Sequence, residues 1–366
     1  MKEMMNIYEK VKHLYEKQYD IHFCKVDEID KVVSFIDSYW QKNHIFTKSR
    51  ELLDWQHYDK VNQRYNFVIA VHKGTGEIHA LIGFIMSSIY DAAIRTPVRW
   101  GAIWKVREDV SEKGLGVVLK GFMETYAYAP YVAGIGLSHY SKEINAKLGE
   151  EVGQLSLFYM LNAGMKEYSL AGAYEDVHFP KTEKSAEECG FQTISKDEFI
   201  GGDKIYFQSI PPFKSPQYYV GRYFEHPIYR YHFTEMINEK GEADACLVWR
   251  FCSAGSARCI VVADYLGSGA ELPGHYYNFQ KLLSENDAEY ISFFNLGMKE
   301  QYFKEAGFQN INESDIIIPV YYEPFLKKNV ILDYHYYADE GVPDGKIFFK
   351  GDADQDRPNR LMERDV

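Results

Sequence analysis

Apolar side chains recur at helical spacing in several parts of the first half of the chain. Between residues 28 and 40 they lie three or four positions apart, as on one face of a helix: Ile29, Val32, Val33, Ile36 and Trp40. The same spacing follows the glycines near residue 115. It predicts helices over 28–40, 49–57, 115–126 and 141–148, and a short polar helix is expected over 1–19.

Runs of β-branched and aromatic residues alternate with these helices. They predict strands over 19–25, 65–72, 77–87, 100–107, 131–138 and 153–161. The residues Lys-Gly-Thr-Gly at 73–76 are typical of a turn, so the two strands on either side of them form a hairpin.

The second half shows a similar alternation of helical and strand patterns. We expect helices over 229–237, 273–283 and 299–306, and strands over 245–251, 258–266, 289–295 and 314–322. An edge strand is possible at 344–349, and 351–366 is expected to be loop.

The stretch between the halves is irregular and richer in Gly, Pro and charge. Its Pro-Pro-Phe-Lys-Ser-Pro run at 211–216 is the best linker candidate. A chain of 366 residues is long enough for two domains. We therefore predict a mixed α/β (α+β) protein with a first domain over 1–163, a linker over 164–215 and a second domain over 216–366, including a polar tail.

Composition and charge disfavour some classes of binding partner. The formal net charge is −12 and no basic run interrupts it, which disfavours nucleic acid and anionic membranes as partners. The five cysteines form no CxxC pair, as is typical of reduced thiols in a cytosolic protein. The N-terminal residues have no apolar signal-like core, and no stretch reaches the roughly 18 apolar residues of a membrane span. These features predict a cytoplasmic protein without a membrane span.

A polar loop at 108–116 precedes the helix at 115–126 and contains Lys113, Gly114, Leu115 and Gly116. A pyrophosphate needs several convergent backbone amides and the start of a helix, and glycine lets the backbone come close to it. Lys113 could also pair with a phosphate. The alternative is a plain strand-to-helix turn with a solvated lysine.

The order of elements in the first domain resembles the GNAT acyltransferase superfamily: a strand, two helices, an antiparallel hairpin, a third strand, a glycine-containing loop and a helix. The region from Trp55 to Gly83 is also similar to acyltransferases found in surface-polysaccharide gene sets. Residues 216–325 resemble a second, degenerate copy, in which 302–308 (YFKEAGF) is similar to the YxKxGF signature of this fold. The resemblance implies two tandem GNAT-like domains, each with a mixed, mostly antiparallel sheet flanked by helices. Tandem GNAT domains also occur in Fem-type peptidyltransferases and N-myristoyltransferases.

By this resemblance the loop binds the pyrophosphate of an acyl-CoA, although Ser111 stands where the family has Gln or Arg. Backbone groups near Val106 and Arg107 would hold the pantetheine arm. A base must take a proton from the amine and an acid must protonate the leaving thiolate. Candidates for these roles are Glu108 and His139 as base and Tyr140 as acid. Solvent exposure or ordinary packing is the alternative for each of them.

The second half offers candidates for the acceptor site. Tyr322 and Glu323 lie in a compact aromatic segment that could line a sugar or amine pocket, or simply end a strand. In the tail, Asp354 and Asp356 could bind an amine, and Arg357 could bind a carboxylate or phosphate bidentately. The alternative is a solvated tail. A calcium loop is disfavoured because Arg357 occupies the position that needs glycine, and no metal is expected.

Together these features predict an acyl-CoA-dependent N-acyltransferase that uses acetyl-CoA or a related acyl-CoA. The acceptor would be the amine of a small polar molecule, and an amino sugar or sugar nucleotide of surface-glycan synthesis is implied by resemblance alone. Two alternatives stay open: a non-catalytic GNAT-like binding or scaffold protein, and a Fem-like aminoacyl transferase.

Overall fold

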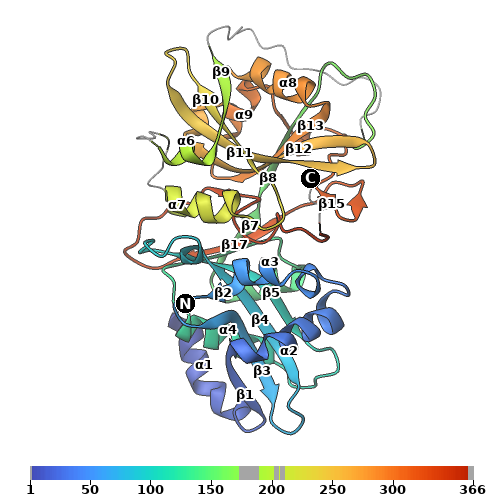
Figure 1. The fold of residues 1–366 in the computed structure, drawn as a ribbon. Helices are drawn as coiled ribbons and strands as arrows, with labels where there is room; N and C mark the ends of the chain where they lie inside the picture. The colour runs from blue at the N-terminus through green and yellow to red at the C-terminus, as the bar shows by residue number, and fades with distance from the viewer. Residues whose placement is uncertain (1, 173–188, 202–205, 207–210, 362–366) are drawn as a thin grey trace.

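The computed structural model describes residues 2–172, 189–201, 206 and 211–361. Two lobes stack one on the other, and each is built on an eight-stranded sheet (Figure 1). The sheets are mostly antiparallel and carry helices on their faces, so the predicted mixed α/β (α+β) class with two such sheets is confirmed.

The first sheet is antiparallel except where β5 meets β6. Its strands run in the order β1 (Tyr19–Lys25), β3 (Arg64–His72), β4 (Ile78–Met86), β5 (Val98–Val106), β6 (Tyr131–Ile135), β17 (Asp333–Ala338) and β7 (Glu151–Gln154), with β2 (Tyr58–Asp59) paired to β3.

The second sheet repeats this plan, with one parallel pair between β12 and β13. Its strands run in the order β14 (Gln309–Asn310), β8 (Ser156–Leu161), β13 (Ala288–Leu296), β12 (Ala257–Gly267), β11 (Ala243–Ala254), β10 (His232–Ile237) and β9 (Gly190–Ile194), with β18 (Phe348–Phe349) paired to β13. A separate hairpin joins β15 (Tyr321–Tyr322) to β16 (Phe325–Leu326).

Helices cover both faces of the first sheet, which explains why β3 is apolar on both sides. Val68 and Ala70 pack with α4, whereas Phe67 and Ile69 pack with α2 and α3. The helices of the described chain are α1 (Lys2–Tyr15), α2 (Ile29–Phe35) with a π turn to Trp40, α3 (Arg50–His57), α4 (Leu115–Tyr126), α5 (His139–Lys147), α6 (Lys196–Ile200), α7 (Pro216–Tyr219), α8 (Tyr276–Glu285) and α9 (Glu300–Glu305).

The two sheets exchange strands. β8 comes from the first half of the chain but lies between β13 and β14 of the second sheet. β17 comes from the second half but lies between β6 and β7 of the first sheet. The predicted boundaries 1–163, 164–215 and 216–366 stay a prediction, and strands of each sheet lie on both sides of them.

Most elements of the first half form where the pattern predicts them, including the hairpin of β3 and β4. The strand predicted at 153–161 is two strands, because the chain leaves the first sheet at Leu155 and enters the second. The helix predicted at 229–237 is wrong, since 232–237 pairs with β9 and β11 as a strand. The strand predicted at 314–322 is wrong except at its last two residues.

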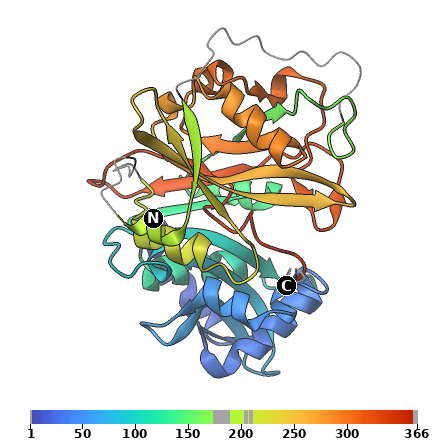
Figure 2. The same ribbon diagram turned by 45° about the horizontal axis from the view of Figure 1, so that its top comes forward.

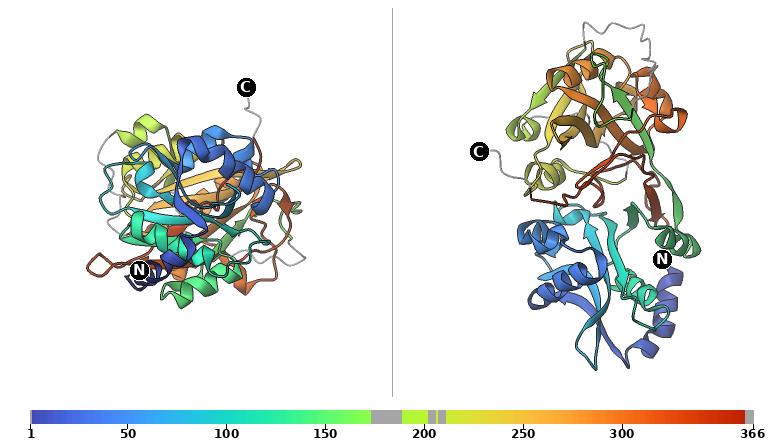
Figure 3. Two further views of the ribbon diagram at one scale, coloured as in Figure 1. Left: turned by 90° about the horizontal axis from the view of Figure 1, so that it is seen from below. Right: turned by 90° about the vertical axis from the view of Figure 1, so that its right-hand side faces the viewer.

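The C-terminal segment is not a solvated tail. Residues 350–357, which we call the C-terminal strap, run between the two lobes (Figure 2), and Gly351–Ala353 and Asp356 are buried. Arg222 donates to the carbonyl oxygens of Gly351 and Ala353, and Lys214 forms an ion pair with Asp352 at 2.6 Å. Viewed from the side, the red C-terminal residues occupy the junction of the lobes (Figure 3, right).

We expect residues 1–163 expressed alone not to fold cooperatively. This fragment lacks β17, so β6 and β7 lose the strand between them, and it carries β8 without its partners. Circular dichroism during heating should show no sigmoidal transition for the fragment and a cooperative one for the full chain. A sharp transition of the fragment would show that the exchanged strand is dispensable.

Candidate functional site

A cavity of about 420 Å³ and a larger one of about 720 Å³ lie beside each other in the described structure. The larger one, which we call the cleft, is lined by β5, the loop before α4, the first turns of α4 and α5, and the end of β6. His335 of β17 and residues of the C-terminal strap close it.

The cleft exists because β5 and β6 separate. Their parallel pairing covers only three residue pairs and ends at Trp100 and Ala133. Beyond that point the edge of β5 from Gly101 to Val106 faces the cleft rather than another strand, although β4 still pairs with its opposite edge. Backbone groups on this open edge are available to an extended ligand.

The start of α4 meets the outer part of the cleft. Gly114 has φ +90°, a left-handed conformation that favours glycine, and it is the N-cap of the helix without a side-chain cap. Leu115 and Gly116 are the first helical residues, so their amides have no acceptor within the helix. Free amides and the positive end of the helix dipole favour an anion here.

A chain of buried charges forms the floor of the cleft. Arg99 pairs with Glu124, and Lys120 joins Glu124 at 3.3 Å to Glu150 at 2.8 Å. Burial opposes ionisation of Glu150, yet Lys120 and His335 hold the pKa of that carboxyl well below its usual range. Burial also opposes the charge of Lys120, but its two carboxylate partners raise the pKa of the ammonium.

His335 is the last member of this chain. Its Nδ1 atom contacts Glu150, and only 4% of the residue is exposed. An ionised carboxylate can only accept, so Nδ1 carries the proton and Nε2 is a free acceptor. Nε2 lies over Gly134 and would be 3.4 Å from a Cβ atom at Gly101, so it points into the gap between β5 and β6.

The structure brings some predicted site residues together around the cleft. Its lining includes Val106, Lys113, Gly114, Leu115, Gly116, Tyr140, Asp354 and Arg357. Of these, Tyr140 is 72% exposed. Tyr322, Glu323 and again Arg357 line the smaller cavity.

Other predicted residues lie outside both cavities. Arg107 forms ion pairs with Glu77 and Asp109, at 2.9 and 2.6 Å. The side chain of Glu108 is 90% exposed and contacts Lys105, and His139 is similarly exposed beside Glu143. Asp356 is buried and forms an ion pair with Arg250 at 2.7 Å. Burial raises the pKa of its carboxyl, but the charge and hydrogen bond of Arg250, the charge of Lys350 and the hydrogen bond from Tyr231 lower this pKa to about 2.

Sequence reasoning missed the buried charges. Lys120 and Glu124 carry a usable signal, because an ion pair four residues apart stands on the otherwise apolar α4. His335 carries none: its partner Glu150 is 185 positions away and belongs to another part of the chain.

No group of three metal-ligating side chains occurs within the residues that the structure describes. Over the same residues, no helix has the length and apolar character needed to cross a membrane. None of the five cysteines forms a disulfide.

No protein-family model matches the chain, and no curated protein matches it in sequence. Solved structures do share its architecture. A GCN5-related N-acetyltransferase from Kribbella flavida is 11% identical with a TM-score of 0.52, covering 88% of this chain and 72% of that one. The chain has the GNAT fold.

Two further solved structures are similar to the chain at lower TM-scores. A GCN5-related glucosamine N-acetyltransferase region of a fungal multi-domain β-N-acetylglucosaminidase is 10% identical with a TM-score of 0.51, over 87% of this chain and 38% of that one. Saccharomyces cerevisiae N-myristoyltransferase with bound myristoyl-CoA is 9% identical with a TM-score of 0.47, over 88% and 80% of the two chains.

Replacing Lys120 with Met should destabilise the fold by about 3–5 kcal/mol, because two buried carboxylates lose their shared cation. Urea unfolding followed by circular dichroism measures this change. Lys281→Met, which removes an exposed lysine from α8, should leave the midpoint within error. Equal effects of the two substitutions would show that the buried charges contribute no specific stability.

Proposed function

We propose that this protein is an acyl-CoA-dependent N-acyltransferase that moves an acetyl or related acyl group to the amine of a small polar acceptor. The observation that supports this proposal most directly is the geometry of the cleft. It combines an open strand edge, uncapped helix amides at one end and a buried His-Glu pair whose free nitrogen faces the gap. The acyl-CoA is a substrate, and the proposal needs no metal.

Each part of the cleft suits one part of the acyl-CoA. Lys113 and the amides of Gly114, Leu115 and Gly116 would bind the pyrophosphate. The open edge of β5 that ends at Val106 would bind the pantetheine arm by backbone hydrogen bonds. Arg107, the other residue predicted for this role, donates its amide to the carbonyl of His79 instead. The thioester would then lie in the part of the cleft between β5 and Tyr140, where amides of β5 would polarise its carbonyl oxygen.

This geometry favours His335 as the base ahead of Glu108 and His139. The Nε2 atom of His335 faces the gap, whereas neither Glu108 nor His139 lines the cleft. Nε2 takes the proton of the acceptor amine while the amine nitrogen bonds to the thioester carbon. The carbon–sulfur bond breaks, its electron pair leaves on sulfur, and the hydroxyl of Tyr140 supplies a proton to that sulfur. Glu150 holds the imidazole in the required tautomer and stabilises its protonated form.

For the acceptor we favour an amino sugar or sugar nucleotide used in surface-glycan synthesis. The likeness of the chain to polysaccharide-associated acyltransferases supports this choice, and so does the glucosamine N-acetyltransferase region found among the structures of the same fold. We propose a cytoplasmic location, which suits an acyl-CoA substrate and a set of five cysteines without a CxxC pair.

Isothermal titration of acetyl-CoA into the full chain should show micromolar binding that Gly101→Val abolishes. The valine fills the gap between β5 and β6, and its Cβ atom has room there, with His335 Nε2 at 3.4 Å as its nearest neighbour. Gly190→Val is the matched control, since Gly190 is a strand residue outside both cavities whose added Cβ would meet its nearest atom at 4.0 Å. Absence of binding to the unmodified chain would contradict the proposal and favour a non-catalytic role.

His335→Gln should lower kcat by about 10²–10⁴ and leave acetyl-CoA affinity unchanged, because the amide cannot act as a base. Burial lowers the pKa of His335 below its ordinary value, so the ring is neutral at pH 7. The rate should therefore be level near neutrality and fall as the pH drops through that pKa. Thiol release with glucosamine as acceptor measures both effects, and an acid limb that persists in His335→Gln would assign the base elsewhere.

A further inference from the structure

We propose that the smaller cavity binds a phosphate or carboxylate group of the acceptor, so that the acceptor is an anionic amine. This inference rests on the proposed function and specifies its substrate. The cavity of about 420 Å³ lies beside the cleft and is built from β11, the turn after it, β15 and the C-terminal strap.

The lining of this cavity is strongly cationic in an acidic chain. It contains one carboxylate, that of Glu323, and five basic side chains: Arg250, Arg258, Lys350, Arg357 and Arg360. The whole protein has a formal net charge of −12. A hollow that gathers cations against this background attracts anions, because a concave wall focuses the field of its charges.

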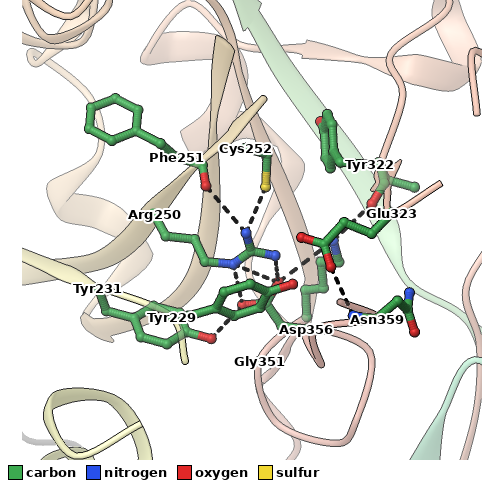
Figure 4. A network of polar contacts seen from close by, with 12 residues as sticks. Tyr229, Tyr231, Arg250, Phe251, Cys252, Tyr322, Glu323, Gly351, Asp356 and Asn359 are labelled. Atoms are coloured by element: carbon green, nitrogen blue, oxygen red, sulfur yellow. Dashed lines mark hydrogen bonds and ion pairs between the residues drawn. The ribbon is translucent and has the colours of Figure 1, made fainter. Parts of the chain in front are cut away.

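Three of these cations already have a carboxylate partner: Arg250 pairs with Asp356, Arg357 with Asp354 at 3.1 Å, and Arg360 with Glu323 at 3.9 Å. Arg250 forms a bidentate ion pair with Asp356, and its remaining nitrogen donates to the carbonyl of Phe251 and contacts the sulfur of Cys252 (Figure 4). Glu323 is occupied in turn, because it accepts from the backbone amides of Asn359 and Arg360 at 2.8 and 3.1 Å. Arg250 and Glu323 therefore form part of the cavity wall, and a bound anion would be held by other side chains.

Three cations keep unused hydrogen-bonding capacity. Lys350 is 3% exposed and makes one hydrogen bond, to the carbonyl of Val320 at 3.1 Å, with Asp356 more distant at 3.8 Å. Arg357 donates from Nη1 to Asp354, while its buried Nε has no acceptor within the described structure. Arg258 is exposed and has no carboxylate partner among the described residues, its guanidinium lying over the ring of Phe251.

The pKa of the Cys252 thiol is also affected by these positive charges. Burial alone would raise its pKa, but a hydrogen bond with Cys259 and the charges of Arg250 and Lys350 lower it. An anion placed beside Lys350 would gain from these charges in the same way. A phosphate or carboxylate also offers the several acceptor oxygens that the open donors of Lys350 and Arg357 require.

The two cavities share part of their lining, which lets one ligand reach both. Tyr321, Gln355, Arg357 and Asn359 line each of them. Gln355 links the strap to the end of β6 by donating to the carbonyl of Ile135 at 3.1 Å. An acceptor whose anionic group meets Lys350 and Arg258 can therefore present its amine to the cleft that contains His335.

The anionic group belongs to the acceptor rather than to the acyl-CoA. The proposed pyrophosphate site at 113–116 lines only the cleft, and no residue of that loop or of α4 lines the smaller cavity. Arg357 stands at the junction, so it is placed to contact the acceptor between its two ends.

The test compares three amino sugars by isothermal titration into the full chain: glucosamine, glucosamine 6-phosphate and muramic acid, which carries a carboxylate. We expect at least one of the two anionic sugars to bind about tenfold or more tightly than glucosamine. Arg258→Gln combined with Arg360→Gln should remove this preference, since both side chains are at least partly exposed and line only this cavity. Arg95→Gln, at an exposed arginine outside both cavities, should retain it.

The proposal is overturned if all three sugars bind equally, or if the preference survives in the double variant with the fold intact by thermal melting. Acetyl-CoA is titrated separately to distinguish the two proposals. Binding of acetyl-CoA without any anionic preference would reject only the anionic acceptor. Anionic preference without acetyl-CoA binding would keep the anion site and reject the acyltransferase.

Discussion

Three buried cations hold the C-terminal strap between the lobes, and the arrangement of the site depends on them. Lys214 contacts Asp352 and Asp264, Arg222 donates to two strap carbonyls, and Arg250 pairs with Asp356. Buried charges are costly to remove from water, so they are tolerated only where their partners stand in one geometry. The strap is therefore fixed in position along its length.

This anchoring determines the chemistry available in the first lobe. The strap supplies Asp354, Gln355 and Arg357 to the cleft, and the preceding β17 supplies His335. Tyr321 and Asn359 also come from the second half of the chain, and the remaining lining residues precede 146. In the proposed reaction the open edge of β5 and the start of α4 would bind one substrate, while residues from the end of the chain would activate and orient the other.

The parts that the sequence predicted are those determined by local physics. The hairpin at 64–86 follows from alternation and a turn, and the loop before α4 follows from two glycines, one of which has φ +90°. The strand at 232–237 was misread as a helix because Tyr229, Phe233, Met236 and Ile237 recur three or four positions apart, as on one face of a helix. His335 and the strap escaped prediction because their partners lie far away in sequence: Glu150 for His335, and Arg222 and Arg250 for the strap.

The exchange of β8 and β17 also sets an order of events during synthesis. The residues of the β5 edge and of the glycine loop are synthesised within the first 300 positions, yet the gap between β6 and β7 stays open until residues 333–338 appear. His335 arrives with that same strand. A nascent chain therefore acquires the proposed base and the last strand of its first sheet in one step, so the proposed reaction would have to wait until that strand is made.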